Sequence, residues 1–457
     1  MLAELRGLNE ECGVFGIWNH SGAAQMAYYA LHSLQHRGQE GAGIAATDGE
    51  TLRIRKGQGF VAEVFNAECI DELRGSGAIG HVRYSIGGIN GFENVQPLLI
   101  RSQSGDIAIA HNGNITNSRM LRGSLEERGS IFQTAVDAEI LAHLAKRGGP
   151  GSLPQQIKGA LEKLEGAYAF VVLTEDALYA ALDPYGLKPL ALGKLGEGYV
   201  VSSETCAFDL IGAEFLRDVQ PGEFLTINDQ GVHSSSFGPR KKRALCVMEY
   251  MYFSRPDSNL RGLNVHTARK MLGKALAKEH PVQADVVTGV PDSSLSAAIG
   301  YAEATGIPYE LGLVKSRYVG RTFIEPSQSL REQGVKLKLS AVRGVVDGKR
   351  VAMIDDSFVR GTTSRRIATM LKDAGATEVH VLIASPTIRY PCFYGMDTLS
   401  TDELMAARHD LEELRVMIGA DSLRFLSVEK MDEVFGCGLC AACFTGEYPA
   451  GEGEKRV

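Results

Sequence analysis

Residues 351–364 read VAMIDDSFVRGTTS, and this stretch decides how the C-terminal part of the chain folds. Its apolar start predicts a buried strand that delivers Asp355 and Asp356 at its C-terminal end. These carboxylates are suited to accept hydrogen bonds from ribose hydroxyls or to hold Mg²⁺. Backbone N–H groups and hydroxyls at a helix N-terminus bind anions. The residues that carry such groups into the next predicted helix are Arg360, Gly361, Thr362, Thr363 and Ser364.

Asp followed by Thr or Ser can also simply cap a helix. Two adjacent acids ahead of Arg-Gly-Thr-Thr-Ser are a much less common pattern, and they favour a site for phosphate and ribose.

Strand–loop–helix units flank this stretch on both sides. Residues 284–290 (ADVVTGV) predict a strand that leads through PDSS into a helix over 295–305, and residues 378–386 (EVHVLIASP) predict a third strand. Strands that alternate with helices indicate an α/β unit with a parallel sheet covered on both faces. Ligands of such sheets bind at the carboxyl ends of the strands, where both distinctive loops fall.

The 351–364 stretch closely resembles the fingerprint of type I phosphoribosyltransferases, and two further segments extend the resemblance. Residues 290–294 (VPDSS) would cradle pyrophosphate, with Ser293 contacting Mg²⁺ beside Asp355 and Asp356. Residues 315–324 (KSRYVGRTFI) would be a flexible lid over the transition state. A basic loop can also be an ordinary exposed loop, but its place between two units of a phosphate-binding sheet favours the lid. The lid residues expected to bind the substrate are Lys315, Arg317 and Arg321.

The implied chemistry is displacement of pyrophosphate from C1 of a ribose. Positive charge must stabilise the leaving group, and water must be excluded because hydrolysis would waste the substrate.

The first 235 residues follow another pattern, with short apolar strands, Gly-rich turns, and helical patterns near 22–35 and 136–146. This predicts an α+β domain with much antiparallel pairing. The Ser-, Gly- and Pro-containing basic stretch at 230–244 marks a boundary. At 457 residues the chain exceeds what one core usually supports. We therefore expect one domain over 12–235 and a second over 236–457.

Cys12 directly precedes the first predicted strand, in EECGVFGIW at 10–18. A lone cysteine there would normally be a small core residue. The motifs that change this interpretation are QHRGQEGAG (35–43), HVRYS (81–85), HNGNITN (111–117), TAVDAEI (134–140), DPYGLKPL (183–190) and SSETCAFD (202–209). Together they resemble the glutaminase domain of the N-terminal-nucleophile amidotransferases, which implies an αββα sandwich.

In that family the cysteine must be the first residue, because its own α-amino group is the base; a model α-amino pKa of about 7.7–8.0 suits that role. Residues 1–11 would therefore be a propeptide. By resemblance, Cys12 attacks the side-chain amide of glutamine to give a thioester. Asn112 and the Gly113 N–H would form the oxyanion hole.

The residues that the resemblance assigns to glutamine binding are Arg37, Arg83 and Asp137. Arg83 suits the α-carboxylate as a fork-shaped donor, and Asp137 suits the α-ammonium. Arg37 would help to position the site.

Three cysteines near the C-terminus form CGLCAAC at 437–443. Cys-x-x-Cys spacing is typical of a metal site, but it does not separate zinc from iron–sulfur. The chain as a whole resembles the glutamine phosphoribosylpyrophosphate amidotransferases, whose propeptide-bearing branch carries a structural [4Fe–4S] cluster. The ligands would correspond to Cys246, Cys392, Cys440 and Cys443, which leaves Cys437 as the odd one out.

Composition bounds the other functions. The net charge of −7 argues against a general nucleic-acid surface. No run approaches the roughly 18 apolar residues of a membrane span, and the N-terminus is too short and acidic for a secretory signal. We expect a cytoplasmic protein with reduced cysteines.

The combined resemblance implies that glutamine yields glutamate and ammonia. Ammonia then converts 5-phosphoribosyl 1-pyrophosphate to 5-phosphoribosylamine and pyrophosphate, the first committed step of de novo purine biosynthesis. Because free ammonia is mostly protonated at neutral pH, a sealed passage between the halves is expected. The family also implies inhibition by purine nucleotides and a homotetramer.

Two other classes of protein share part of this pattern. An amidotransferase that makes glucosamine phosphate would share the first half but lack DDSFVRGTTS. A regulator that only senses the sugar would have no use for Cys12, Arg83, Asn112 and Asp137 together.

Overall fold

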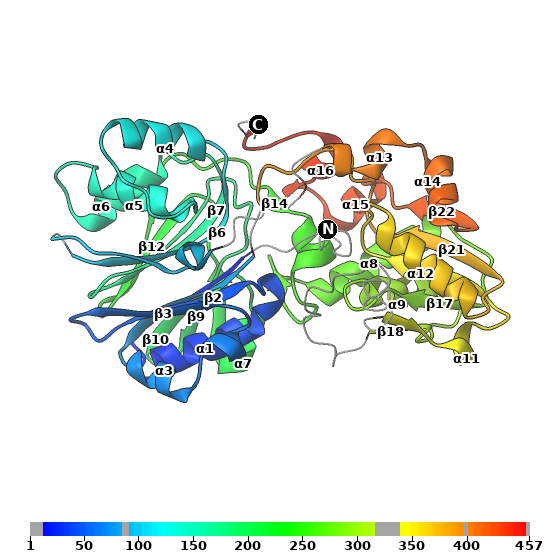
Figure 1. Cartoon of the computed structure of the whole chain (residues 1–457), viewed down its shortest axis with the longest axis horizontal. Helices are drawn as coiled ribbons and strands as arrows, with labels where there is room; N and C mark the ends of the chain where they lie inside the picture. The colour runs from blue at the N-terminus through cyan, green and yellow to red at the C-terminus, as the bar shows by residue number, and fades with distance from the viewer. Residues whose placement is uncertain are drawn as a thin grey trace.

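The computed structural model describes residues 12–84, 91–103, 105–315, 339–396, 398 and 401–453. The expected propeptide at 1–11 and the expected lid residues Arg317 and Arg321 lie outside these ranges. Two lobes lie side by side, the first from the N-terminal half and the second from the C-terminal half (Figure 1).

The N-terminal lobe contains two stacked antiparallel sheets. The seven-stranded sheet has the order β11-β9-β10-β1-β4-β2-β3. Its strands are β1 (Gly13–Trp18), β2 (Gly41–Thr47), β3 (Leu52–Gln58), β4 (Gly77–Arg83), β9 (Ala191–Leu195), β10 (Gly198–Ser202) and β11 (Glu214–Asp218). The six-stranded sheet has the order β13-β12-β8-β7-β6-β5. Its strands are β5 (Leu98–Ile100), β6 (Ile107–Ile115), β7 (Gly166–Leu173), β8 (Leu178–Leu182), β12 (Glu223–Asn228) and β13 (Gly231–Ser236).

Small apolar side chains let the two sheets approach closely. Val14 and Ala45 of one sheet pack with Ala108 and Ala169 of the other in a buried core. The outer faces are covered by helices (Figure 1). These are α1 (Ala23–Ser33), α2 (Val61–Val64), α3 (Ala67–Glu72) and α7 (Cys206–Ile211) on the larger sheet, and α4 (Ser118–Glu127), α5 (Ala138–Lys146) and α6 (Leu153–Leu161) on the smaller one. The lobe is therefore the expected αββα sandwich.

The C-terminal lobe is built on a four-stranded parallel sheet in the order β17-β20-β21-β22. Its strands are β17 (Val286–Gly289), β20 (Arg350–Asp355), β21 (Glu378–Ile383) and β22 (Ser422–Phe425). Apolar cores cover both faces. One face packs against α8 (Val265–Glu279), α9 (Leu295–Thr305) and α15 (Val428–Phe435), and the other against α11 (Arg343–Val346), α12 (Thr362–Asp373) and α14 (Leu411–Ile418).

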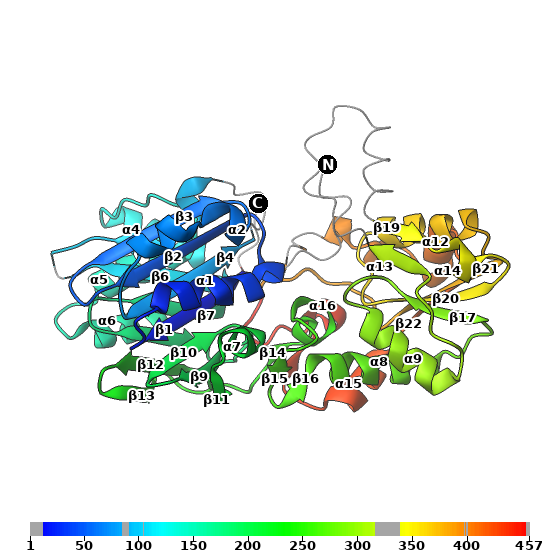
Figure 2. The same ribbon diagram turned by 90° about the horizontal axis from the view of Figure 1, so that it is seen from below.

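Segments from distant parts of the sequence meet where the lobes join. The short strand β14 (Leu245–Cys246) pairs in parallel with β23 (Leu439–Cys440), and the π-helix η5 (Glu249–Phe253) follows β14. Figure 2 shows β14 beside α16 (Ala442–Thr445) at this junction. The Asn114 amide donates to the Phe393 carbonyl at 2.9 Å across it. The remaining short elements are η2 (Gln35–Arg37), η4 (Phe92–Asn94), β15 (Asn259–Leu260), β16 (Leu263–Asn264), β18 (Leu313–Lys315), β19 (Leu339–Ala341), η6 (Thr401–Glu403) and α13 (Met405–Arg408).

Candidate active sites

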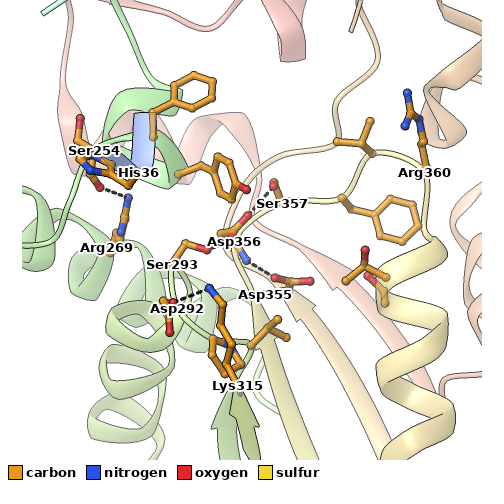
Figure 3. Close-up of a pocket in the computed structure, with 18 of the residues that line it drawn as sticks. His36, Ser254, Arg269, Asp292, Ser293, Lys315, Asp355, Asp356, Ser357 and Arg360 are labelled. Carbon is orange, nitrogen blue, oxygen red and sulfur yellow. Dashed lines mark hydrogen bonds and ion pairs between the residues drawn. The ribbon is translucent and has the colours of Figure 1, made fainter. Parts of the chain in front are cut away.

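A pocket of about 450 Å³ lies at the carboxyl ends of β17 and β20 (Figure 3). It brings together every described residue that the sequence assigned to phosphate, ribose or Mg²⁺. Those residues are Ser293, Lys315, Asp355, Asp356, Arg360, Gly361, Thr362, Thr363 and Ser364.

The acid pair is buried at the edge of the parallel sheet. Asp355 ends β20, and Asp356 follows it. Asp356 accepts hydrogen bonds from the Ser293 hydroxyl and, at 2.5 Å, from the Ser357 hydroxyl. Burial raises the pKa of both carboxyls, and the charge of Asp356 raises the pKa of Asp355 further. Two buried carboxylates are stabilised by a cation or by hydroxyl donors, so the pair fits Mg²⁺ or a sugar diol.

The phosphate loop enters α12 through a left-handed glycine. Gly361 has φ 67°, and a Cβ there would lie 2.8 Å from Phe358 Cζ. Glycine therefore fits this turn on both backbone and packing grounds. The helix begins at Thr362, so its first N–H groups lie at the pocket wall, where they can donate hydrogen bonds to a bound anion.

Two cations of the pocket are paired with acids. Lys315 Nζ lies 2.7 Å from Asp292 Oδ2, and Arg360 Nη2 lies 2.6 Å from Glu403 Oε2. Figure 3 shows Arg360 well away from the acid pair. Direct contact of Arg360 with a phosphate therefore stays a prediction that requires its guanidinium to leave Glu403.

Sequence reasoning missed several residues of the pocket wall, and three of them are polar side chains that lie far from the predicted loops in sequence. His36 and Gln39 come from the N-terminal lobe, and Arg269 comes from α8. Arg269 is buried and donates to the carbonyls of Tyr250 and Ser254, and its charge partly offsets the burial that raises the pKa of Asp356. Nothing in the α8 sequence separates it from an ordinary surface arginine, because only the folded chain shows its burial.

The second site lies where β1 and β4 run side by side. Cys12 directly precedes β1, and the pairing of Gly13 with Val82 brings it next to Arg83 at the end of β4. The Cys12 Sγ lies 3.5 Å from the carbonyl oxygen of Tyr84. Burial lowers the pKa of Arg83, while the neighbouring Cys12 thiol acts in the opposite direction. Cys12 and Arg83 thus occupy one site.

The other predicted glutaminase residues lie on or beside β6 of the facing sheet. Asn112 is fully buried, and neither polar atom of its amide has a hydrogen-bond partner among the described residues. A buried amide in that state is suited to a ligand. Gly113 has φ 135°, and a Cβ there would lie 2.1 Å from the Ala167 carbonyl oxygen, so only glycine fits. Asp137 Oδ2 accepts a 2.9 Å hydrogen bond from the Ile115 N–H at the end of the same strand.

A buried contact connects these two sheets beside the site. His81 Nε2 of β4 lies 3.1 Å from the carbonyl oxygen of His111, the residue before Asn112. Burial lowers the pKa of both imidazoles to about 3, so both are neutral at physiological pH.

Arg37 is fully buried and donates hydrogen bonds to other groups of the protein. Its Nε donates to the Cys12 carbonyl oxygen at 3.2 Å, and its other nitrogens donate to Glu204 and Glu249. This arrangement supports a positioning role, and direct contact with glutamine stays a prediction.

The four predicted cluster ligands converge where the lobes join. Cys246 of β14 pairs in register with Cys440 of β23. Burial and the neighbouring Cys392 thiol raise the pKa of Cys440 to about 12, and the same causes raise that of Cys443. Cys437, the predicted odd one out, is exposed.

Among the described residues, no group of three or more His, Cys, Asp or Glu side chains is arranged around a single metal ion. This is compatible with both predicted metal groups. Mg²⁺ takes one or two carboxylates and completes its shell with water and substrate phosphates. In a [4Fe–4S] cluster each thiolate binds a different iron, so the four sulfurs do not meet at one point.

A glutaminase-like sandwich that carries Cys12, joined to a parallel sheet that carries an acid pair and a phosphate loop, defines a glutamine amidotransferase that acts on a phosphoribosyl substrate. Residues 81–209 match the family described as glutamine amidotransferase domain.

Full-length comparisons identify the family. The chain is 64% identical to the amidophosphoribosyltransferase of Bacillus subtilis (strain 168), over 98% of this chain and 96% of the relative. It is 52% identical to that of Staphylococcus aureus (strain Mu50), over 97% and 92%. A solved glutamine phosphoribosylpyrophosphate amidotransferase from B. subtilis, complexed with ADP and GMP, superposes with a TM-score of 0.93 at 62% identity, covering 98% of this chain and 99% of that one.

The chain belongs to the amidophosphoribosyltransferase family. Its reaction is the glutamine-dependent conversion of 5-phosphoribosyl 1-pyrophosphate to 5-phosphoribosylamine, the first step of purine biosynthesis. None of the helices formed by the described residues is long and apolar enough to cross a bilayer.

Proposed function

We propose that the chain divides this reaction between Cys12 in the N-terminal lobe and the acid-pair pocket in the C-terminal lobe. The observation that carries the proposal is the position of η2 between the two sites. His36 lines the pocket, while the next residue, Arg37, donates to the carbonyl of Cys12. Consecutive residues of η2 therefore touch both sites, so the path that ammonia would take between them is short.

Glutamine hydrolysis begins once residues 1–11 have been removed and the α-amino group of Cys12 is exposed. That amine takes the thiol proton, and the thiolate attacks the side-chain amide to give a thioester and ammonia. Asn112 and the Gly113 N–H stabilise the oxyanion, which gives the buried amide of Asn112 its missing partner.

Recognition of glutamine is assigned to the ends of facing strands. Arg83 binds the α-carboxylate and Asp137 binds the α-ammonium. Arg37 acts behind Cys12 by holding its carbonyl oxygen.

The pocket of the C-terminal lobe binds the phosphoribosyl substrate. Asp355 and Asp356 accept hydrogen bonds from the ribose hydroxyls, and residues 360–364 surround a phosphate with N–H and hydroxyl donors. Lys315, with Arg317 and Arg321 of the lid, balances charge on departing pyrophosphate. Mg²⁺ would be held by Asp355, Asp356 and Ser293, and when bound it supplies further positive charge for the leaving group.

The test removes the nucleophile. In the full chain, Cys12→Ala should abolish glutamine-dependent release of pyrophosphate and leave ammonia-dependent release intact, because ammonia rather than Cys12 reacts with the sugar. Equal loss of both activities in a folded variant would refute the two-site proposal.

The convergent cysteines support one structural [4Fe–4S] cluster bound by Cys246, Cys392, Cys440 and Cys443. Such a group would tie segments almost two hundred residues apart in sequence, and metal binding of this kind contributes directly to folding. It also accounts for four cysteines gathered at the junction of the lobes.

Regulation, assembly and location complete the proposal. The solved relative bound to ADP and GMP supports inhibition of this chain by purine nucleotides. Exposed apolar residues on the edge strand β11, Phe215 and Leu216, are compatible with burial in a homotetramer. We place the protein in the cytoplasm, where its thiols stay reduced. Sedimentation of the pure protein with and without a purine nucleotide tests both assembly and binding.

A further inference from the structure

Arg37 belongs to a group of four buried charged residues. Arg37, Glu204 and Glu249 have 0% relative exposure and Lys188 has 1%. Arg37 Nη1 lies 2.7 Å from Glu204 Oε1 and 2.9 Å from Glu249 Oε2, and Nη2 lies 2.8 Å from Glu249 Oε1. Glu249 thus binds Arg37 in the two-bond fork that fixes the plane of a guanidinium.

One acid of this group comes from the other half of the chain. Arg37, Lys188 and Glu204 belong to the N-terminal lobe, whereas Glu249 comes from η5, beyond residue 235. Burial alone would raise the pKa of Glu249, but the charge and hydrogen bonds of Arg37, together with the charge of Lys188, lower it. A buried charge without its partner is costly. Glu249 therefore stabilises the buried guanidinium of Arg37 in its present position.

The contact held by Arg37 matters most for a chain that begins at Cys12. Once an N-terminal cysteine has no preceding residue, it is joined to the protein only through its own carbonyl carbon. The hydrogen bond from Arg37 Nε to that carbonyl oxygen then restrains both the amine and the thiol. A displacement of about 1 Å at a reacting group can cost about a hundredfold in rate.

We propose that Glu249, a residue of the C-terminal half, is a positioning residue for the glutaminase, because it locks Arg37 against the carbonyl of Cys12. This inference rests on the proposed role of Cys12 as the nucleophile. It means that the glutaminase takes part of its nucleophile's support from the other half of the chain.

The test compares Glu249→Gln with a matched control, Glu223→Gln, in the full processed chain. Glu223 is also a buried carboxylate in a two-bond fork, with Arg217 at 2.7 and 2.9 Å, but it lies on β12 away from Cys12. The probe is 6-diazo-5-oxonorleucine, a glutamine-like diazoketone that alkylates a reactive thiol. Its rate of attachment to Cys12 is followed by peptide mass mapping, beside glutamine-dependent and ammonia-dependent synthesis.

Glu249→Gln should slow alkylation of Cys12 and lower glutamine-dependent kcat by about a hundredfold, with little change in the KM for glutamine. Ammonia-dependent synthesis should stay close to the wild-type rate, and Glu223→Gln should leave alkylation unchanged. Glu249→Asp, which keeps the charge on a shorter side chain, should recover part of the loss. If Glu249→Gln does not fold, Glu249→Asp and Glu223→Asp give the same comparison.

Wild-type alkylation rates in a folded Glu249 variant would overturn the inference. So would a parallel loss of alkylation and ammonia-dependent synthesis in both Glu249 and Glu223 variants, since that pattern reports only destabilisation. Attachment of the probe to another residue in the wild-type chain would instead refute Cys12 as the nucleophile.

Discussion

Gly361→Ala tests whether the phosphate loop depends on the absence of a side chain. With φ 67°, an alanine at this position is held in the left-handed region, which costs roughly 1–2 kcal/mol. The new Cβ would also lie 2.8 Å from Phe358 Cζ. The ring would have to retreat by more than about half an ångström to reach normal contact.

Phe358 has little room to retreat. Its ring is buried and packs edge-on against Phe425, with ring centroids 5.6 Å apart. Forcing a side chain of this kind to move costs roughly 1–3 kcal/mol. The alternative is a shift of the loop itself, which would move the N–H groups of 361–364 away from the bound phosphate. We expect the KM for 5-phosphoribosyl 1-pyrophosphate to rise by about tenfold or more, equivalent to at least about 1.4 kcal/mol.

Gly419→Ala is the matched control. Gly419 has φ 69° at the end of α14, and a Cβ there would meet nothing within 4 Å. Gly419→Ala should lose only the roughly 1–2 kcal/mol of stability that a left-handed alanine costs, as measured by melting. It should keep the wild-type KM for 5-phosphoribosyl 1-pyrophosphate. The assay is ammonia-dependent pyrophosphate release, which bypasses the glutaminase. Equal stability loss in the two variants, with an unchanged KM for Gly361→Ala, would refute the close-packing argument.

Three other predictions follow from the sites. Asp356→Asn should lower ammonia-dependent synthesis by about a hundredfold without lowering the melting temperature, since it relieves repulsion in a buried acid pair; near-normal kinetics would show that this carboxylate does not act on the substrate. Wild-type protein purified without oxygen should be brown, with about four iron atoms per chain. The Cys443→Ser variant should be colourless, and the control variant Cys69→Ser should stay brown. Stoichiometric zinc without iron in the wild-type protein would contradict the cluster. His111 has a folded-state pKa of about 3 against 6.5 in the unfolded chain, so the unfolded state binds more protons between these values and stability falls as pH falls from about 6.5. His111→Gln should remove about 1.4 kcal/mol per pH unit from that slope below pH 6.5, and identical pH dependence of melting in the two proteins would exclude the effect.

The strands and loops with strong local patterns could be predicted from sequence. The apolar runs before VPDSS and DDSFVRGTTS became β17 and β20, and the predicted helix over 295–305 is α9. Strand β22 was missed because its sequence, SLRF, is short and carries a charge on its exposed face. Local patterns thus revealed the sheet but not its edge.

Residues that act through tertiary contacts could not be predicted in the same way. Glu204 lies in SSETCAFD and Glu249 in a short helix, and both look like ordinary acids until the fold buries them around Arg37. The convergence of Cys246 with Cys440 likewise comes from a strand pairing across almost the whole C-terminal half. Sequence spacing carries no information about which distant segments pair.

The two side chains that the N-terminal lobe contributes to the phosphoribosyl pocket, His36 and Gln39, limit how such an enzyme can evolve. A glutaminase and a phosphoribosyltransferase brought together by gene fusion would not share a wall, so each could diverge separately. Here we expect a substitution in the segment after α1 to change both activities, because it contacts both sites. Exchange of either half for a homologue would therefore need compensating changes at residues 36–39 of the chimera.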